Sequence, residues 1–424
     1  AELLKNKGFL VTGSDISDSP NVQRLIELGI NVTIGHNAEN ISDSELVIYS
    51  DAIPKNNIEL KNALSKNLLV YSRARMISEI AKLNNSTVAI AGTHGKTTTT
   101  SMVGSILKAL ELDPTIIVGG VVKSLETNSA LGSGDTFVVE ADEYNKSLLH
   151  LSPTIAVINN IDFEHIECYE DLEDLKETFL QFANSVPFYG SVCACLDSIN
   201  VASIIKRIDK PLISYGIENK DVDIRAENIQ QKNGKVTFNA KIKDKIFSVN
   251  LSVPGRYNVY NALAAAAAAN AIGINKENIA SGLELFGGVD GRLQQKKCLC
   301  GATMIDDSYN ANPESVRAAL SVLANISAEK RILVLGDMAE LGDAAIDFHE
   351  CIGKEARLIG IDRLFALGKL SAHSVSKFGS GGQHFRNIED ILAVIESVLA
   401  PDVALLVKGS RFMQMDRIVR KFEV

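Results

Sequence analysis

Cysteine is scarce and tryptophan is absent in this chain of 424 residues. The six cysteines form no Cys-x-x-Cys pair, and so few thiols in so long a chain exclude a disulfide-stapled scaffold. A zinc site would need more partners at suitable spacing, so we interpret the cysteines of the strand-like runs as buried, reduced thiols. This usage fits a reducing compartment and predicts a cytoplasmic protein. The six are Cys168, Cys193, Cys195, Cys298, Cys300 and Cys351.

Long apolar runs are also missing. No stretch reaches the length of about 18 apolar residues that a membrane helix requires. The alanine-rich run at 262–271 is too short and too weakly apolar to span a bilayer, and it predicts a tightly packed helix. No secretory leader, internal repeat or low-complexity segment stands out. We therefore expect no membrane span.

Basic residues are fewer than acidic ones, 43 against 52, so the formal net charge is −9. This balance argues against nucleic acid or an anionic membrane as the main partner, because both carry negative charge. A local basic pocket for an anionic metabolite is still compatible with it. The hydrophobic share of 46% and the charged share of 22% indicate a globular protein with a real core.

Helix-like and strand-like segments alternate along the chain, which predicts an α/β fold of three domains. A polar break separates the first domain (1–84) from a central domain (85–287), and a third domain spans 288–424. The first and third domains are expected to be Rossmann-like. The first is expected to lack its first strand, because the end of a helix precedes the strand predicted at 9–12.

The predicted elements follow from periodicity and turn residues. Alternating apolar and polar residues over 224–253 predict hairpins in the central domain. A turn is predicted at Gly13-Ser14-Asp15, just after the first strand. Further strands are predicted near 32 and at 47–49, 87–90, 115–118, 136–139, 155–159, 191–194, 212–215, 303–305, 331–335, 363–366 and 403–407, and helices at 20–28, 58–65 and 97–110.

The segment AIAGTHGKTTTT (89–100) ends an apolar strand and opens a helix. Ile90 stands where the strict P-loop pattern has its first glycine, but the other groups that bind phosphate are present. Glycines let backbone N–H groups approach phosphate oxygens, the helix N-terminus attracts anions, and Lys96 can reach the β- and γ-phosphates. The alternative is a strand-to-helix turn that merely needs small residues. The residues predicted to bind nucleotide here are Gly92, Thr93, His94, Gly95, Lys96, Thr97 and Thr98.

Polar groups also gather after two other predicted strands. Ligands bind at the C-terminal ends of parallel strands, and carboxylates and imidazole beside a phosphate loop suit Mg²⁺ that bridges ATP and a second substrate. The alternative is a solvated acidic loop. The residues are Glu140, Asp142 and Glu143 after one strand, and Asn159, Asn160, Asp162 and His165 after the other.

Several motifs in combination resemble the Mur ligase family of peptidoglycan synthesis. They are GTHGKTTT (92–99), EADE (140–143), NNI through His165 (159–165) and GRYN with Asn261-Ala262 (255–262). Residues 1–285 are most similar to the family type that adds L-alanine. Residues 288–424 are most similar to the type that adds D-Ala-D-Ala, since Asn310, Ala311 and Asn312 stand where the L-alanine type carries two histidines. A hybrid of both types is therefore one hypothesis.

The resemblance implies an ATP-dependent ligase that forms an amide bond through an acyl phosphate, with ATP and Mg²⁺ as cofactors. The implied partners are a UDP-N-acetylmuramate-type nucleotide sugar and an amino acid or dipeptide. Three hypotheses stay open: an L-alanine-adding ligase, a D-Ala-D-Ala-adding ligase, and a nucleotide-binding protein without ligase turnover. A ligase of the folate polyglutamate type is a weaker rival, because the first domain resembles a uridine-nucleotide domain.

The resemblance also implies roles for single residues. The implied catalytic residues are Lys96, Glu140, His165 and Arg292, and the implied Mg²⁺ ligands are Thr97, Glu140 and His165. Asn258, Asn261, Arg292 and Asp306 would join the phosphate loop in binding ATP. Gly13, Ser14, Asp15, His36 and Ser50 would face the uridine nucleotide, and Asn310, Asn312 and Lys408 the incoming amino acid or dipeptide.

Overall fold

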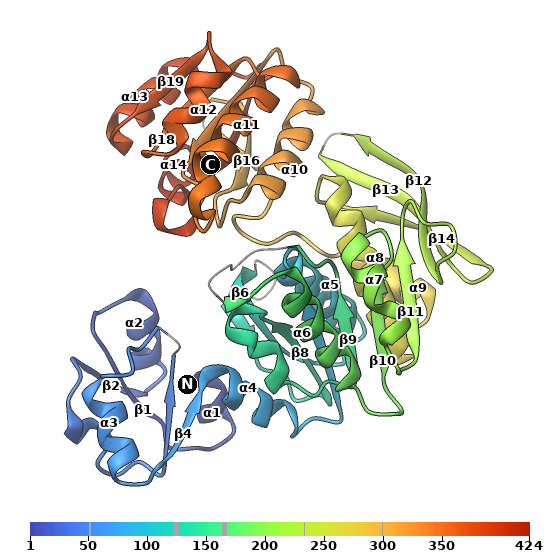
Figure 1. The fold of residues 1–424 in the computed structure, drawn as a ribbon. Coiled ribbons are helices and arrows are strands. Elements are labelled where there is room, and N and C mark those ends of the chain that lie inside the picture. The colour runs from blue at the N-terminus through green and yellow to red at the C-terminus, as the bar shows by residue number, and fades with distance from the viewer. Residues whose placement is uncertain (51, 123–126, 163–167, 233, 299) are drawn as a thin grey trace.

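The computed structural model describes residues 1–424 apart from 51, 123–126, 163–167, 233 and 299. Figure 1 shows three α/β units that follow one another along the chain, from the blue N-terminal unit through the central unit to the orange and red C-terminal unit. The predicted α/β class is confirmed. None of the helices in the described part of the chain combines the length and the apolar character that crossing a bilayer requires.

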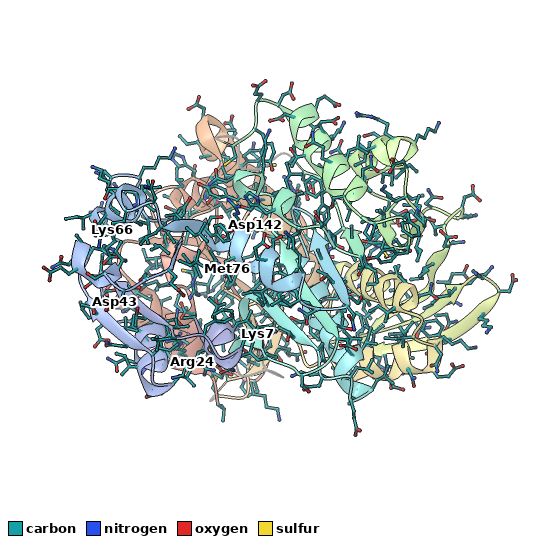
Figure 2. All side chains as sticks on the ribbon, turned by 90° about the horizontal axis from the view of Figure 1, so that it is seen from below. Lys7, Arg24, Asp43, Lys66, Met76 and Asp142 are labelled. Carbon is teal, nitrogen blue, oxygen red and sulfur yellow. The ribbon has the colours of Figure 1, made fainter. Side chains whose placement is uncertain are left out.

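The N-terminal unit contains two separate pairs of parallel strands, β1 with β2 and β3 with β4. Thr12 aligns with Asn31 in the first pair, and Leu46 with Leu69 in the second. Figure 2 places Met76 of α4 between this unit and the central one, where it packs on the central core. The elements are α1 (Glu2–Asn6), β1 (Thr12–Asp15), α2 (Pro20–Glu27), β2 (Asn31–Ile34), the 3-10 helix η1 (Ala38–Ile41), β3 (Leu46–Tyr49), α3 (Ile58–Ser65), β4 (Leu69–Ser72) and α4 (Arg73–Ala81).

The central unit is built on a ten-stranded sheet in the order β14-β13-β12-β11-β10-β9-β5-β8-β6-β7. β5 runs parallel to both of its neighbours, so the loop that follows it opens among the C-terminal ends of strands. The predicted hairpins are confirmed as β12 to β14.

The strands of the central unit are β5 (Ser86–Ala91), β6 (Thr115–Val122), β7 (Thr127–Ala130), β8 (Thr136–Ala141), β9 (Ile155–Ile158), β10 (Ser191–Cys195), β11 (Leu212–Gly216), β12 (Ile224–Lys232), β13 (Lys235–Ile242) and β14 (Lys245–Leu251). Its helices are α5 (Lys96–Ala109), α6 (Leu172–Asn184), α7 (Ile199–Ile204), α8 (Arg256–Ile272) and α9 (Lys276–Glu284), with 3-10 turns η2 (Tyr144–His150) and η4 (Ile205–Arg207).

Helices cover both faces of this sheet. Val88 and Ile90 of β5 point into one hydrophobic cluster, which they share with α5, α8 and α9. Ala89 and Ala91 point into a second cluster, which they share with α4, α6 and α7, because successive strand residues face opposite sides. The alanine run of α8 is buried in the first cluster, as predicted for a tightly packed helix.

The C-terminal unit has its own six-stranded sheet in the order β15-β16-β20-β17-β18-β19. Apart from the antiparallel β15, the strands run parallel, and helices cover both faces. The elements are β15 (Gln294–Lys297), β16 (Thr303–Asp307), α10 (Pro313–Ala324), β17 (Lys330–Gly336), η5 (Gly342–Ala344), α11 (Ala345–Leu358), β18 (Arg363–Leu367), α12 (Ser371–Phe378), β19 (Gly382–Phe385), α13 (Ile388–Val398), β20 (Val403–Lys408), η6 (Arg411–Met413) and α14 (Asp416–Phe422).

The turn predicted at Gly13-Ser14-Asp15 is wrong. These residues form most of β1, because they pair with 32–34 of β2, and this pairing outweighs their local preference for turns. The turn follows β1, where the backbone N–H of Ser17 donates to Asp15 Oδ1 at 3.1 Å.

Three of the four cysteines in the two strand-like runs are buried, as predicted. Cys193, Cys195 and Cys298 are buried, whereas Cys300 is exposed, and all six thiols are free. Burial raises the pKa of Cys195 and of Cys298 to about 11 each, so both thiols stay protonated at neutral pH.

Candidate functional site

The loop between β5 and α5 has the backbone that a phosphate cradle needs. Gly95 adopts a left-handed φ of 80°, and a Cβ there would lie 2.3 Å from Asn261 Oδ1. Gly92 has a φ of 142°, and its Cβ would lie 2.9 Å from the Cβ of Asn159. Only glycine fits both positions, so the loop can present its backbone at close range ahead of the N-terminus of α5.

Neighbouring side chains fix the shape of this loop. The amide of Asn160 accepts from the backbone N–H of His94 at 2.8 Å and donates to its carbonyl at 3.2 Å. The hydroxyl of Thr93 accepts from the N–H of Asp162 at 2.8 Å and donates to its carbonyl at 3.1 Å. The loop is therefore held by the segment after β9, whose polar residues the sequence placed beside it.

Lys96 begins α5, and its ammonium is paired with a carboxylate. Its Nζ donates to the carbonyl of Gly92 at 2.8 Å and to both carboxylate oxygens of Glu143 at 2.7 and 2.9 Å. Burial on its own would lower the pKa of the ammonium, but Glu143 and Asp142 outweigh it and raise the pKa. Lys96 is therefore a permanently charged group that points into the site.

Oxygen groups suited to Mg²⁺ stand around this lysine. Thr97 follows it in α5 and is 4% exposed, and Glu140 stands near the C-terminal end of β8. Both line the same cleft as Lys96, and hydroxyl and carboxylate oxygens are the ligands that Mg²⁺ prefers. These residues fit a magnesium ion next to a phosphate chain. His165, the third predicted ligand, lies outside the described residues.

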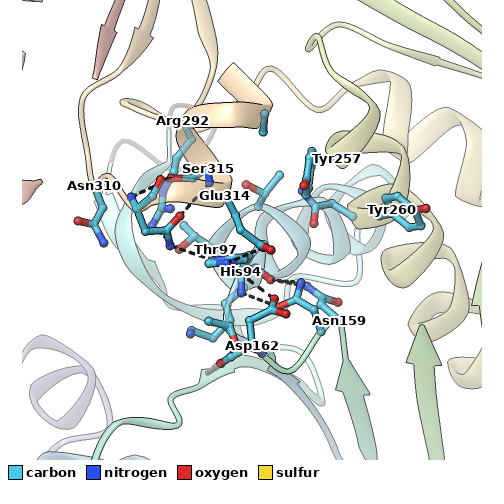
Figure 3. Close-up of a pocket in the computed structure, with 18 of the residues that line it drawn as sticks. His94, Thr97, Asn159, Asp162, Tyr257, Tyr260, Arg292, Asn310, Glu314 and Ser315 are labelled. Carbon is cyan, nitrogen blue, oxygen red and sulfur yellow. Dashed lines mark hydrogen bonds and ion pairs between the residues drawn. The ribbon is translucent and has the colours of Figure 1, made fainter. Parts of the chain in front are cut away.

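A cleft of about 1180 Å³ opens between the central and C-terminal units, and Figure 3 shows 18 of the residues that line it. Its volume is that of a site for a large metabolite. The predicted site residues that line it are Thr93, His94, Gly95, Lys96, Thr97, Thr98, Glu140, Asn258, Asn261, Arg292, Asn310, Asn312 and Lys408. Gly92 lies below the surface of the loop.

Asn258 and Asn261 brace the loop from α8. The Asn258 amide donates to the carbonyl of Pro254 at 2.6 Å, and the Asn261 amide donates to Asn258 Oδ1 at 3.3 Å. Asn261 Oδ1 in turn accepts from the hydroxyl of Thr99 at 3.3 Å. Both asparagines also line the cleft. Their contact with the nucleotide stays a prediction.

Arg292 reaches the loop from the link to the C-terminal unit. Its Nη2 lies 3.5 Å from Thr97 Oγ1, and its guanidinium stacks on the ring of Tyr309 at 4.2 Å from the centroid. This places a second positive charge in the cleft that Lys96 lines, and a guanidinium there suits the phosphates of a nucleotide.

Asp307 and Lys408 form a buried ion pair that also lines the cleft, with Lys408 Nζ at 2.5 Å from Asp307 Oδ2. Burial is the largest influence on both, and it lowers the pKa of the Lys408 ammonium and raises the pKa of the Asp307 carboxyl. Asp306, the predicted residue, is placed elsewhere. Its carboxylate lies 3.1 Å from Lys296 Nζ, and Asp306 is not among the residues that line the cleft.

The start of α10 brings the C-terminal unit to the phosphate loop. Asn312 is the N-cap of α10 in a capping box with Ser315, and its Nδ2 lies 3.4 Å from His94 Nδ1. Asn310 is exposed at the cleft, as a residue that meets an incoming substrate would be.

The predicted uridine-nucleotide residues lie in the N-terminal unit, away from this cleft. The hydroxyl of Ser14 donates to Glu59 Oε2 at 2.7 Å, and His36 Nδ1 lies 3.4 Å from the same oxygen. Burial would raise the pKa of Glu59, but hydrogen bonds from Ser14, Asn40 and the backbone of Asn37 lower it. Ser14 and His36 thus lie together beside the Glu59 carboxylate. Of the other predicted residues, Gly13 and Ser50 are exposed and Asp15 is half-buried.

Sequence reasoning missed three residues that the structure brings to these sites, and it missed the partner of a fourth. Glu59, Asp307 and Glu314 carry no motif signal of their own, and each becomes important through a partner far away in the chain. Glu143 was named, but its pairing with Lys96 was not foreseen. An Asp-Asp pair at the end of β16 could have directed attention to Asp307, because one of two successive strand residues must face the cleft.

The fold and the cleft define a class: a three-domain α/β protein with a glycine-rich loop that lines a cleft between its last two domains. Three family models of the Mur ligases match in series, described as the Mur ligase family catalytic domain (1–85), the middle domain (90–269) and the glutamate ligase domain (291–411). The chain belongs to the Mur ligase family.

Curated relatives carry the name UDP-N-acetylmuramate–L-alanine ligase. The protein from Sulfurihydrogenibium sp. (strain YO3AOP1) is 35% identical over 434 residues, which cover 100% of this chain and 94% of that protein. The protein from Rhizobium meliloti (strain 1021) is 41% identical over 387 residues, which cover 89% of this chain and 81% of that protein.

Solved structures of two family types share the fold. The UDP-N-acetylmuramate-alanine ligase MurC from Thermotoga maritima superposes with a TM-score of 0.82 at 24% identity, and covers 99% of this chain and 95% of its own. MurF from Acinetobacter baumannii superposes with a TM-score of 0.70 at 26% identity, and covers 82% of this chain and 78% of its own.

Proposed function

We propose that this chain joins L-alanine to UDP-N-acetylmuramate in an ATP-dependent reaction that forms an amide bond. The observation that carries the proposal is the half-buried Lys96 at the end of a glycine-rich loop, in the same cleft as Arg292, which reaches the adjoining Thr97. The names of the relatives support the choice of substrates, since one relative aligns with the whole chain. The free thiols support a cytoplasmic location, because they suit a reducing compartment.

The central unit would hold ATP. Lys96 and the backbone of the loop would neutralise the phosphates, and Thr97 and Glu140 would hold Mg²⁺, which supplies further positive charge at the transferred phosphate. The carboxylate of the sugar nucleotide would attack the γ-phosphate, release ADP and give an acyl phosphate. The amine of L-alanine would then attack the acyl carbon, and phosphate and a proton would leave as the amide forms. The chain contributes position and charge, with Arg292 placed to stabilise the negative charge that develops.

The C-terminal unit would bind the amine substrate. The Asp307–Lys408 pair and Asn310 line the cleft on that side, so a carboxylate and an ammonium of a small amino acid would each find an opposite partner there. Closure of this unit over the loop would exclude water from the acyl phosphate.

Addition of D-Ala-D-Ala is the second candidate. Asn310 and Asn312 favour it, because they stand where the sequence resemblance expects histidines in an L-alanine type, and both line the cleft. The likeness to the MurF structure at 26% identity supports the same reading.

The test is phosphate release from Mg-ATP and UDP-N-acetylmuramate, with L-alanine and D-Ala-D-Ala compared and the product identified by mass. L-alanine addition is expected, and dipeptide addition would favour the second candidate. Lys96→Ala should abolish release, whereas the matched control Lys108→Ala, exposed on the same helix, should retain it. Bound ATP without any release that depends on an amino acid would refute both ligase proposals.

A further inference from the structure

Three side chains from three separate elements converge beside the phosphate loop. His94 comes from the loop itself, Asp162 from the segment after β9, and Glu314 from the first turn of α10 in the C-terminal unit (Figure 3). His94 Nε2 lies 3.4 Å from Glu314 Oε2 and 3.8 Å from Asp162 Oδ2. One ligand-type atom from each residue lies within 4.8 Å of the other two.

The two separations from His94 Nε2 are close to those between the ligands of a bound ion. Two ligands of a tetrahedral Zn²⁺, each about 2.0–2.1 Å from the metal, are about 3.3 Å apart. An imidazole nitrogen with two carboxylate oxygens is also a ligand set that Zn²⁺ accepts, and three protein ligands leave a fourth position for water. We propose that His94, Asp162 and Glu314 bind one Zn²⁺ ion, which links the phosphate loop to the C-terminal unit.

The surroundings hold the three ligands in place. The backbone of Asp162 is fixed by its two hydrogen bonds to the Thr93 hydroxyl, and the backbone of His94 by its two hydrogen bonds to Asn160. Glu314 lies within the capping box of α10, between Asn312 and Ser315. The His94 side chain is 17% exposed, that of Asp162 35% and that of Glu314 49%, so an ion can reach the site from solvent.

This site differs from the expected magnesium site in residues and in chemistry. The expected Mg²⁺ ligands are Thr97, Glu140 and His165, none of which belongs to this site, whereas one imidazole with two carboxylates is a ligand set that Zn²⁺ binds tightly. The inference does not rest on the proposed function, because metal binding to these three residues needs no nucleotide and no turnover.

One hydrogen bond must change when the ion binds. The Asn312 amide donates toward His94 Nδ1, which places the proton of a neutral imidazole on Nε2. A ligand nitrogen must carry a lone pair, so coordination through Nε2 moves that proton to Nδ1 and breaks the contact with the amide. An aspartate at 312 would instead accept from Nδ1–H, as carboxylates do behind many zinc-bound histidines, and would still cap α10.

The experiment measures Zn²⁺ binding to the full chain without nucleotide, by competition with a chromophoric chelator, and repeats it with Co²⁺ to record the spectrum of the bound ion. One equivalent is expected, with a Co²⁺ spectrum that lacks thiolate bands. Glu314→Gln should weaken the affinity for Zn²⁺ at least tenfold, and Asn312→Asp should strengthen it. Glu340→Gln, which removes another carboxylate of the same cleft, is the control and should bind as the unchanged chain does.

Other outcomes would overturn the proposal. Equal Zn²⁺ affinity in Glu314→Gln and in the unchanged chain would mean an adventitious ion only, and thiolate bands would place the ion on cysteine. Unchanged or weaker binding in Asn312→Asp would contradict coordination through Nε2. Should Glu314→Gln fail to fold by circular dichroism, His94→Gln removes a ligand from the other side of the cleft and must lose the same equivalent.

Discussion

Replacement of Glu143 by glutamine removes the negative charge that pairs with Lys96 and keeps the shape of the side chain. The Glu143 side chain is 2% exposed and contacts Lys96 Nζ with both oxygens, while the Lys96 side chain is 16% exposed. Removing one partner of a buried ion pair costs about 3–5 kcal/mol. Because Lys96 retains some contact with solvent, we expect the lower end, about 3 kcal/mol, for Glu143→Gln.

The loss of stability in Glu143→Gln should be smaller when nucleotide is bound. For a domain the size of the central unit, about 3 kcal/mol corresponds to a fall in the unfolding temperature of about 6–12 °C. Phosphates bound beside Lys96 would replace the missing carboxylate, so Mg-ATP should raise the unfolding temperature of Glu143→Gln by more than that of the unchanged chain.

Calorimetry with and without Mg-ATP measures both quantities. Glu173→Gln, which removes a carboxylate that is 75% exposed and pairs with Lys176, is the control and should shift the midpoint very little. A midpoint for Glu143→Gln equal to that of the control, or an equal ATP-induced rise in both, would refute the reasoning that Glu143 neutralises Lys96.

Three further predictions concern single contacts. Gly95→Ala should lose ATP binding in equilibrium titrations, because a Cβ at a φ of 80° would meet Asn261, while the fold persists by circular dichroism. Lys408→Met should destabilise the C-terminal unit by about 3 kcal/mol in urea unfolding, since Asp307 would be left as an unpaired buried charge. The double variant Lys408→Met with Asp307→Asn should recover part of this loss of stability. Burial lowers the pKa of His349, whose Nε2 accepts from the backbone N–H of Met338 at 3.0 Å. The unfolded chain takes up that proton first, so stability should fall as pH drops below about 6.5, and His349→Gln should flatten this dependence.

The sequence predicted the glycine-rich loop between strand and helix correctly, because the residues that form it are neighbours in the chain. The strand, the glycines and Lys96 of the loop stand together in sequence, and the structure keeps them together. The short strand β4 was missed, since four residues give little periodicity. The partners of Ser14 and Lys96 could not be predicted, because Glu59 and Glu143 meet them only once separate elements have packed.

Among the described residues, three polar contacts between the phosphate loop or the start of α5 and the C-terminal unit are long. Arg292 to Thr97, Asn312 to His94, and His94 to Glu314 span 3.4–3.5 Å, and no hydrophobic cluster among the described residues unites the cores of the two units. Long polar contacts of this kind exchange with water at little cost. We therefore expect a small free-energy difference between a closed and an open cleft, so that a bound ligand or ion shifts the balance between the two states.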